Sequence, residues 1–441
     1  MQGKRWFYFV LIGSFLISLT VSFIIKHPVD RTSDSHTYDA IAMNLVSGSG
    51  YTDEGVQPTM TREPLYPFFL AFIYSIAGHN YAAVKFIQMI LFLITTVLAY
   101  KIAKMIFDEN TARYAMIFTA FFPTLLNYPS YILSETVFTF LVALFVFSCV
   151  GFYLENKLFY CILSGLSLGL LILCKCAMLP FIVVLILWGI FFCKDMPKAI
   201  LMVLISLAVI FPWSYRNYVK FDTFALRGGS ESALAIKVQK LDYTFDDFKK
   251  AAIFTLSEGL GKKMFPDAIE NPRDFLFKED ILVREKILPE LKREGHSDKE
   301  IGRMMRKRIM ERPIKYLAVS FLDLLKLAQF SYLPILNQPD TIEIFNKLPH
   351  GRLWLSLLRA VFRPFAGLLI LFSIIGMYIK RGIWKRWIFL LIIIAYALIT
   401  YSLIYGDARY SVPFIPYYII FSIPAVLKIK ESIINKYVKK A

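Results

Sequence analysis

Apolar residues occur in long runs separated by short polar stretches, and several runs approach the ~20 residues that a helix needs to cross a bilayer. The pattern predicts an all-α polytopic membrane protein. The expected spans cover residues 6–25, 81–107, 112–129, 134–153, 158–174, 177–193, 198–212, 364–379, 387–404 and 411–427. A further run, 316–334, contains Asp323 and Lys326, three residues apart and able to pair on one helix face. Residues 316–363 could therefore cross zero or two times, and we expect about 10–12 transmembrane helices.

The chain has a net charge of +17, and its lysines and arginines cluster in short loops such as 380–386 and in the tail from residue 428. Positive residues flank the cytoplasmic ends of membrane helices and contact anionic lipid there. This distribution predicts cytoplasmic N- and C-termini and argues against a nucleic acid partner. A hydrophobic content of 57% also excludes an ordinary soluble domain.

The first polar stretch, Asp30–Pro67, lies in a predicted outer loop at 27–80 and concentrates ionisable side chains in an otherwise apolar half of the chain. Within it, Asp34–Val46 has apolar residues at helical spacing, which predicts a short helix on the membrane surface with Ser33 as its N-cap. Residues 64–77 are apolar but too short to span, so we expect a second interfacial or re-entrant helix.

A second polar segment, 213–315, is predicted to form an extracytoplasmic helical cap. Asn271-Pro272 is typical of a helix start and predicts a helix to about Arg293. Ser297 and Glu300 form a capping box that predicts another helix to about Glu311. The expected organisation is a catalytic membrane module at 1–212, the cap at 213–315, and a second membrane module at 316–441.

Ionisable side chains at the predicted outer ends of the spans are the candidates for chemistry, because charges at membrane edges are costly and often functional. They come from five separate outer segments: Asp34, Arg62, Glu63, Glu135, Lys175, Arg216, Asp407 and Arg409. Each has a structural alternative, since a carboxylate can cap a helix and a Lys or Arg can extend along the membrane edge to water. Their expected convergence on one membrane face favours function.

Short motifs accompany these residues. The first outer loop contains Asp34-(x3)-Tyr38-(x3)-Ala42, then Gly48, then Arg62-x-Pro64-Leu65-Tyr66-Pro67. Later in the chain come Ser134-Glu135, Pro212-Trp213-Ser214-Tyr215-Arg216-Asn217-Tyr218 and Arg409-Tyr410-x-x-Pro413. Together they resemble the GT-C class of membrane glycosyltransferases. The nearest likeness is to the bacterial branch related to dolichyl-phosphate-mannose-protein mannosyltransferases and to the lipid A aminoarabinose transferase.

The resemblance implies an inverting transferase that moves a sugar from a polyprenyl-phosphate donor to a hydroxyl acceptor on a glycan, lipid or protein. By its match to the family aspartate, Asp34 would be the general base, and Glu135 matches a second acidic position near the acceptor. A lipid phosphate leaving group needs cations, for which the candidates are Arg62, Lys175, Arg216 and Arg409. Supporting roles would fall to Tyr38, Glu63 and Tyr410.

Two features depart from the family. Protein mannosyltransferases carry an Asp-Glu pair where this chain has Asp34-Ser35, so protein mannosylation is not carried over. The chain also lacks the large C-terminal soluble domain of the aminoarabinose branch. No cofactor is assigned: His27, Asp30, Asp34 and His36 are close in sequence and leave a divalent cation open, but they have no recognised ligand spacing. The five cysteines have no metal or redox spacing either.

Three other functions remain open from the sequence. A transporter or flippase of a lipid-linked sugar would use similar cations, although transporters place such groups at the membrane midplane. A polysaccharide polymerase or ligase would also bind lipid pyrophosphate with arginines. A non-catalytic assembly factor is the last alternative. The position of Asp34 between the first two spans favours the transferase.

Overall fold

The computed structural model describes residues 5–24, 29, 34–192, 195–266, 279–328, 346–347 and 350–438. Across these residues the regular structure is helical and no strand occurs, which confirms the predicted all-α class. The chain divides into two compact units. Unit 1 comprises Met1–Leu226, Ser331–Ile394 and Val412–Ala441; unit 2 comprises Arg227–Phe330 and Ala395–Ser411.

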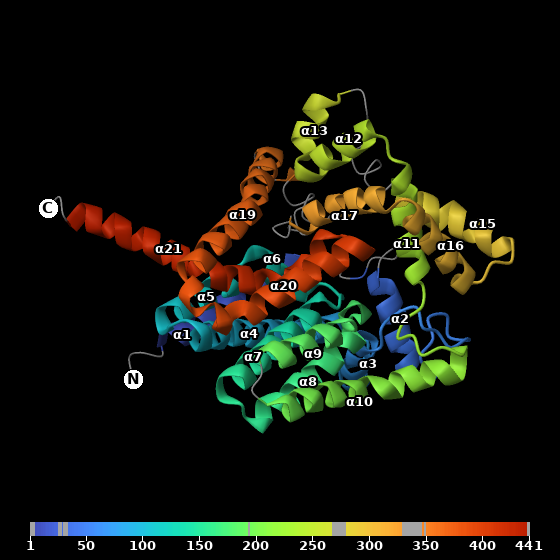
Figure 1. Ribbon diagram of the computed structural model, residues 1–441, viewed down its shortest axis with the longest axis horizontal. Coiled ribbons are helices and arrows are strands. Elements are labelled where there is room, and N and C mark those ends of the chain that lie inside the picture. Colours follow the sequence, from blue (N-terminus) through green and yellow to red (C-terminus); the bar gives the residue numbers. More distant parts are fainter. Residues whose placement is uncertain are drawn as a thin grey trace. The chain divides into compact units, whose positions relative to one another are not determined.

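Unit 1 holds the long apolar helices (Figure 1). Its first half contains α1 (Arg5–Ile24), α2 (Asp34–Val46), α3 (Leu65–Ala77), α4 (Tyr81–Ile106), α5 (Glu109–Ala120), α6 (Pro123–Asn127), η2 (Tyr128–Ser130), α7 (Glu135–Glu155), α8 (Leu158–Cys174), η3 (Cys176–Met178), α9 (Phe181–Phe192) and α10 (Met196–Phe221). Later helices are α19 (Gly351–Ile379), η7 (Arg381–Ile383), α20 (Trp384–Ile404), η8 (Ala408–Phe414) and α21 (Ile415–Val438). Of these, α20 and η8 continue across the unit boundaries.

Unit 2 is built from shorter helices. They are α11 (Ser230–Gln239), η4 (Lys240–Asp242), α12 (Phe245–Leu256), α13 (Glu258–Met264), a π-helical turn η5 (Val283–Ile287), α15 (Leu288–Arg293), α16 (Asp298–Glu311) and α17 (Pro313–Leu327). Residues of α11, η4, η5, α16 and α17 form its apolar core: Ala235, Ile236, Val238, Leu241, Val283, Ile301, Met305 and Val319.

Six helical segments in the described residues are long and apolar enough to cross a membrane. They are Arg5–Ile24, Tyr81–Ile106, Glu135–Glu155, Met196–Phe221, Arg381–Ile404 and Ala408–Asn435. Four shorter apolar helical segments accompany them: Leu65–Ala77, Leu158–Cys174, Cys176–Phe192 and Phe365–Ile379. The multi-pass character is therefore clear, while the crossing number of 316–363 stays open because residues 329–345 lie outside the described part.

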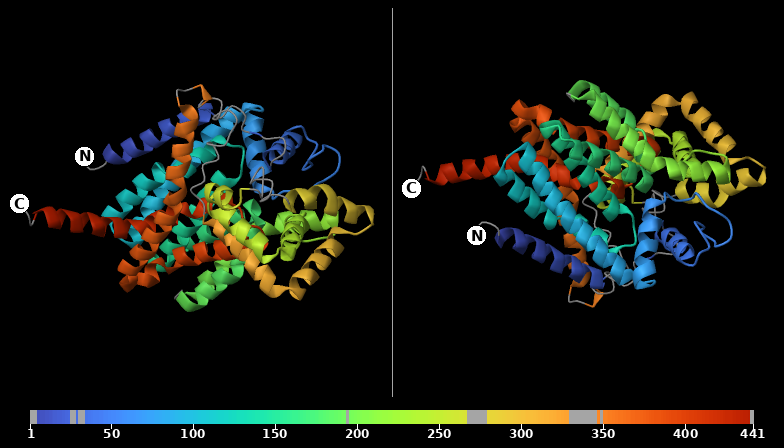
Figure 2. Two further views of the ribbon diagram at one scale, coloured as in Figure 1. Left: turned by 90° about the horizontal axis from the view of Figure 1, so that it is seen from above. Right: turned by 90° about the horizontal axis from the view of Figure 1, so that it is seen from below.

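The segment expected to span at 112–129 is instead interrupted. Helix α5 ends at Ala120, and α6 begins at Pro123, which has no N–H to continue the hydrogen-bond ladder. Helix α1 packs beside this break, where Ser14 Oγ donates to Ala120 O at 2.8 Å. In Figure 2, α1 (dark blue) also runs beside α4 (cyan). The side chain from α1 thus binds a carbonyl at the end of α5.

Close packing of α8 on α10 depends on two glycines. A Cβ added to Gly165 would lie 2.7 Å from both Ile205 Cβ and Met202 O, and one added to Gly169 would lie 2.6 Å from Val209 Cβ. Such distances are shorter than real Cβ contacts, so only glycine permits this approach. Small residues spaced four apart let membrane helices pack backbone to backbone.

Two short helices are present between residues 27 and 80, where the sequence predicted them. Helix α2 covers Asp34–Val46, as predicted, and buries Tyr38 and Ile41. It is followed by Gly48 and Gly50 at φ of 83° and 84°, the left-handed region that favours glycine. Helix α3 has 13 residues, about 20 Å in length, which is shorter than the ~30 Å hydrocarbon core.

Helix ends in unit 2 also follow local signals. The capping box is confirmed: Ser297 Oγ accepts from the Glu300 N–H, the Glu300 carboxylate accepts from the Ser297 N–H, and α16 ends at Glu311. The helix predicted to end near Arg293 does so, although its predicted start at Asn271-Pro272 lies outside the described residues.

Candidate active site

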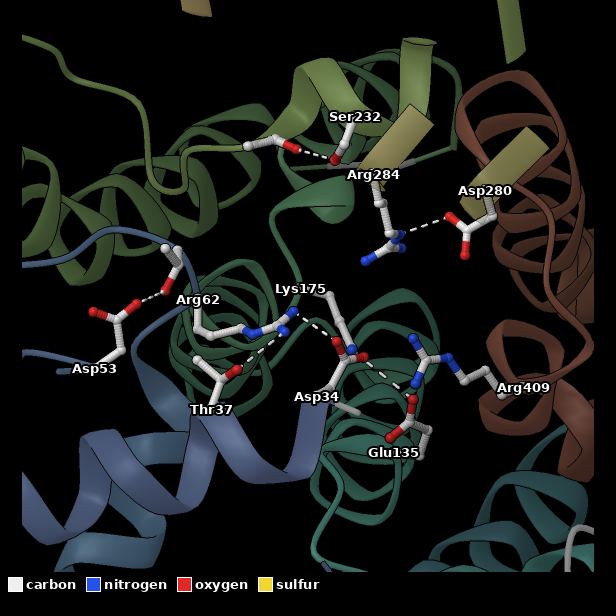
Figure 3. A network of polar contacts seen from close by, with 12 residues as sticks. Asp34, Thr37, Asp53, Arg62, Glu135, Lys175, Ser232, Asp280, Arg284 and Arg409 are labelled. Carbon is white, nitrogen blue, oxygen red and sulfur yellow. Dashed lines mark hydrogen bonds and ion pairs between the residues drawn. The ribbon is translucent and has the colours of Figure 1, made fainter. Parts of the chain in front are cut away.

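Asp34 is the first residue of α2, where the helix end attracts negative charge. Its Oδ1 lies 2.7 Å from Arg62 Nη1, and Arg62 Nη2 donates to Thr37 Oγ1 at 3.4 Å (Figure 3). Both partners of the ion pair are mostly buried, with side chains 20% and 17% exposed. The loop after α2 therefore folds back and brings its arginine to the start of the helix.

The path of this loop is held from two sides. The Tyr51 hydroxyl donates to the carbonyls of Arg62 and Glu63, at 3.0 and 3.2 Å. From α10, Arg216 Nη1 donates to Thr59 O at 2.8 Å and Nη2 donates to Tyr51 O at 3.4 Å. The position of Arg62 thus depends on hydrogen bonds from Arg216 to the backbone of a loop some 150 residues earlier in the sequence.

Arg216 is itself enclosed by protein groups. Its Nη1 also donates to Asn217 Oδ1 at 2.8 Å, and its guanidinium carbon lies 4.7 Å from the Trp213 ring centre. Helix α10 continues through Pro212 to Phe221, so these residues occupy the last turns of a helix rather than a loop. The guanidinium holds the outer loop in place, and its expected role in donor binding stays a prediction.

Two further segments bring charge to the same end of unit 1. Glu135 opens α7, and Lys175 follows the last residue of α8. Lys175 Nζ lies 3.9 Å from Glu135 Oε1, and their side chains are only 12% and 3% exposed. Next to Lys175, the backbone N–H of Cys176 donates to Glu63 Oε1 at 3.2 Å. The first outer loop, the α7 start and the α8–η3 link therefore meet.

Tyr38 lies among these charges. The pKa of Tyr38 is raised, mainly because the phenol is buried. The cations Lys175 and Arg62 lower this pKa, whereas the carboxylates Glu63 and Asp34 raise it. The Arg62 guanidinium carbon is 5.5 Å from the Tyr38 ring centre. The phenol therefore keeps its proton. The charged side chains around Tyr38 form one cluster. We call Asp34, Arg62, Glu63, Glu135 and Lys175 the outer-end cluster.

Arg409 and Tyr410 belong to unit 2. Arg409 Nη2 lies 3.3 Å from the Tyr410 hydroxyl, and the Arg409 N–H donates to Asp407 Oδ1 at 2.9 Å. The Tyr410 ring stacks on Tyr401 at 4.8 Å between ring centres. The motif is thus locally ordered around its arginine, and its part in donor binding stays a prediction.

Gln88 is a positioning residue that the sequence reasoning missed. It is buried in α4, where its Nε2 donates to Pro129 O at 3.0 Å and to Tyr131 O at 2.8 Å. Its Oε1 accepts from the Tyr66 hydroxyl at 3.0 Å. Gln88 therefore fixes the loop that leads to Glu135. An amide in an otherwise apolar run was the signal that could have found it.

The metal question is tested only in part. Among the described residues, no group of three or more His, Cys, Asp and Glu side chains gathers in a way that could hold a metal ion. His36 is exposed on α2, whereas His27 and Asp30 lie outside the described residues. A divalent cation therefore stays open, and no step below depends on one.

Comparison with known proteins finds a partial family match and several structures of similar fold. The family model for dolichyl-phosphate-mannose-protein mannosyltransferase matches residues 57–215. No curated protein matches significantly. The Archaeoglobus fulgidus oligosaccharyltransferase in the apo form has a TM-score of 0.53 and 14% identity over 100% of this chain and 52% of its own. A structure of the same protein, AglB, in complex with an inhibitory peptide and a dolichol-phosphate has a TM-score of 0.51 and 14% identity. The match covers 99% of this chain and 52% of AglB.

Cupriavidus metallidurans ArnT bound to undecaprenyl phosphate has 12% identity over 96% of this chain and 78% of its own. Its TM-score of 0.42 is too low to support an argument. This chain spans about half the length of the oligosaccharyltransferase structures that it matches. The fold is that of the GT-C class of membrane glycosyltransferases, as the sequence motifs predicted.

Proposed function

We propose that this protein is an inverting glycosyltransferase that moves a sugar from a polyprenyl-phosphate donor to a hydroxyl acceptor at the extracytoplasmic membrane face. The observation that carries the proposal is the outer-end cluster, in which three segments distant in sequence meet. Two ion pairs form there, Asp34 with Arg62 and Glu135 with Lys175. A base beside cations is what the transfer of a sugar from a lipid phosphate requires.

Asp34 acts as the general base. An acceptor oxygen attacks the anomeric carbon while the bond from that carbon to the phosphate oxygen breaks. The hydroxyl proton goes to the Asp34 carboxylate, and the electron pair of the broken bond leaves with the polyprenyl phosphate. A single displacement inverts the anomeric configuration and needs no covalent glycosyl-enzyme. Proton transfer to a positioned side chain contributes about 10²- to 10⁴-fold to such a step.

Lys175 and Arg62 stabilise the negative charge that grows on the departing phosphate. Both side chains are mostly buried, and a cation acts more strongly where water is excluded. In the absence of donor they pair with Glu135 and Asp34. Donor binding therefore replaces part of each ion pair, which couples phosphate recognition to release of the base. Glu135 then orients Lys175 or the acceptor hydroxyl.

The donor class is supported by the names of similar proteins. The matching family model is named for a dolichyl-phosphate-linked donor, and one AglB structure contains a dolichol-phosphate. The acceptor has less support. Ser35 stands where the protein mannosyltransferases carry Glu, so a protein acceptor is not favoured over a glycan or a lipid.

The test is a transfer assay with the full chain in nanodiscs, offered a panel of polyprenyl-phosphate sugars with a membrane-lipid and glycan extract. We expect one donor to release polyprenyl phosphate and to place its sugar on an acceptor with inverted configuration. Movement of an intact lipid-linked sugar between leaflets, without any release of polyprenyl phosphate, would instead identify a flippase.

A further inference from the structure

Asp39 is a carboxylate that the proposed reaction does not use, and it lies on α2 five residues after Asp34. Its side chain is 15% exposed. The Tyr74 hydroxyl donates to Asp39 Oδ1 at 2.7 Å, and the Tyr81 hydroxyl donates to Oδ2 at 2.9 Å. Because an ionised carboxylate only accepts, His79 Nε2 is the donor in its contacts with both oxygens, at 2.9 and 3.2 Å. We call Asp39, Tyr74, His79 and Tyr81 the α2 anchor.

The three donors of the α2 anchor come from α3, the start of α4 and the link between these helices. Tyr74 is buried in α3, and Tyr81 is the first residue of α4. His79 lies between Gly78, which ends α3 at a φ of 71°, and Asn80, whose side chain caps α4. The His79 ring packs edge-on against Tyr74 and Tyr81, at 4.9 and 4.8 Å between ring centres. Asp39 therefore binds groups whose own positions are fixed by α3 and α4.

Helix α2 depends on such contacts for its position, because a helix of 13 residues is marginal on its own. Its apolar face packs on α3, where the Tyr38 and Tyr66 rings meet edge-on at 5.0 Å. Apolar contact is non-directional and permits small rotations, whereas hydrogen bonds are directional. At 3.6 residues per turn, Asp34 and Asp39 are about 140° apart around the helix axis and about 7.5 Å apart along it. The pairing of Asp34 with Arg62 and the α2 anchor thus hold the helix from two sides.

We propose that Asp39 is a positioning residue for the transfer reaction. Its hydrogen bonds to α3, the α3–α4 link and α4 fix the rotation and the axial position of α2, and so place the Asp34 carboxylate for proton transfer. This role rests on the proposed function of Asp34 as the base, and Asp39 takes no proton itself. A displacement of about 1 Å at a reacting group can cost about 10²-fold in rate, so a modest shift of α2 has a measurable effect.

The first arm of the test compares Asp39→Asn with wild type in the transfer assay. The amide keeps the size of the side chain but offers one acceptor oxygen to three donors. We expect kcat to fall about 10-fold or more, while the KM for the donor stays within about threefold. The control is Asp53→Asn, whose carboxylate accepts from the Thr59 and Thr61 hydroxyls within the same loop and should be dispensable for turnover.

The second arm combines Asp39→Asn with Asp34→Asn. If Asp39 acts through Asp34, its loss should change turnover little once the base is already absent. Two losses that multiply would show that Asp39 supports the fold in general and would overturn the proposal. An unchanged kcat in Asp39→Asn, or a loss confined to KM, would overturn it as well. If Asp39→Asn does not fold, His79→Gln takes its place in both arms.

The third arm measures hydrogen exchange of the α2 amides and needs no activity. Asp39→Asn should exchange about threefold faster or more at residues 38–46, whereas Asp53→Asn should exchange as wild type does. Wild-type exchange in Asp39→Asn would show that the α2 anchor does not hold the helix and would overturn the proposal. A wild type that transfers no sugar contradicts the proposed function instead, and the exchange rates then still decide whether Asp39 holds α2.

Discussion

Lys175 is a largely buried lysine of unit 1 that follows the last residue of α8. It lies between the apolar helices α8 and η3, and its side chain is only 12% exposed. Its Nζ lies 3.9 Å from Glu135 Oε1. A lysine that only anchors a helix end extends into water, as Lys157 does at the other end of α8 with 67% exposure. This contrast within one helix favours a functional role for the buried lysine.

Lys175→Ala should therefore reduce transfer by about 10²-fold, because one preorganised charge on a developing anion contributes about that much. Lys157→Ala on the same helix is the control and should retain nearly full activity. Both are measured as kcat/KM for the donor. Equal rates for the two variants would remove Lys175 from phosphate stabilisation.

Arg216 allows two residue-level roles to be separated. Its contacts with Thr59 O, Tyr51 O and Asn217 Oδ1 need the fork of a guanidinium, which lysine does not have. Arg216→Lys should therefore loosen the outer loop and increase proteolytic cleavage between residues 47 and 64. A purely electrostatic role in donor binding predicts the opposite: normal protease resistance and activity in Arg216→Lys, with loss only in Arg216→Ala.

At the scale of elements, the helix crossing of α8 and α10 sets the position of Lys175, since α8 ends immediately before that residue. Gly165 and Gly169 lie on the crossing, and an added Cβ at either would meet α10. The stability of this contact is therefore tied to the geometry of the outer-end cluster.

Gly165→Ala should lower the free energy of unfolding by about 1–3 kcal/mol, because overpacking a close contact forces the helices apart. The matched control is Gly367→Ala in α19, where an added Cβ meets nothing within 4 Å. That variant should be neutral or slightly stabilising, since alanine favours a helix over glycine. Thermal unfolding in one detergent compares the two, and equal losses would contradict the packing argument.

Elements governed by local signals were predicted well. The bounds of α2 follow from apolar spacing and two glycines, and α16 follows from its capping box. The interruption between α5 and α6 was not expected, because the run is mostly apolar and Pro123 is the main signal of a break. The hydrogen bonds of Gln88 and Arg216 join residues distant in sequence, so no local pattern indicates them.

At the scale of the whole molecule, the distribution of charge predicts orientation. Lysine and arginine flank one set of loops, and the outer-end cluster lies on the loops of the other set. The positive-inside tendency therefore predicts that the cluster faces away from the cytoplasm. The same orientation would give the cluster access to a lipid-linked donor in the outer leaflet.

This orientation is testable by labelling single cysteines in intact cells with a membrane-impermeant maleimide. Ser49→Cys, exposed in the first outer loop, should react, whereas Lys157→Cys in the loop before α8 should react only after the cells are opened. The background chain carries Cys176→Ser and Cys193→Ser, because Cys176 is part-exposed, whereas Cys149, Cys161 and Cys174 are buried and should contribute little signal. The reverse pattern would place the cluster in the cytoplasm.

The most direct measurement of the central claim is the turnover of Asp34→Asn with the donor found in the panel. The substitution keeps the size of the side chain and removes the base, so turnover should fall by about 10²- to 10⁴-fold while donor affinity changes little. Asp222→Asn, an exposed carboxylate in the left-handed turn after α10, is the control and should behave as wild type. Turnover of Asp34→Asn within a few-fold of wild type would show that another group takes the proton and would contradict the account.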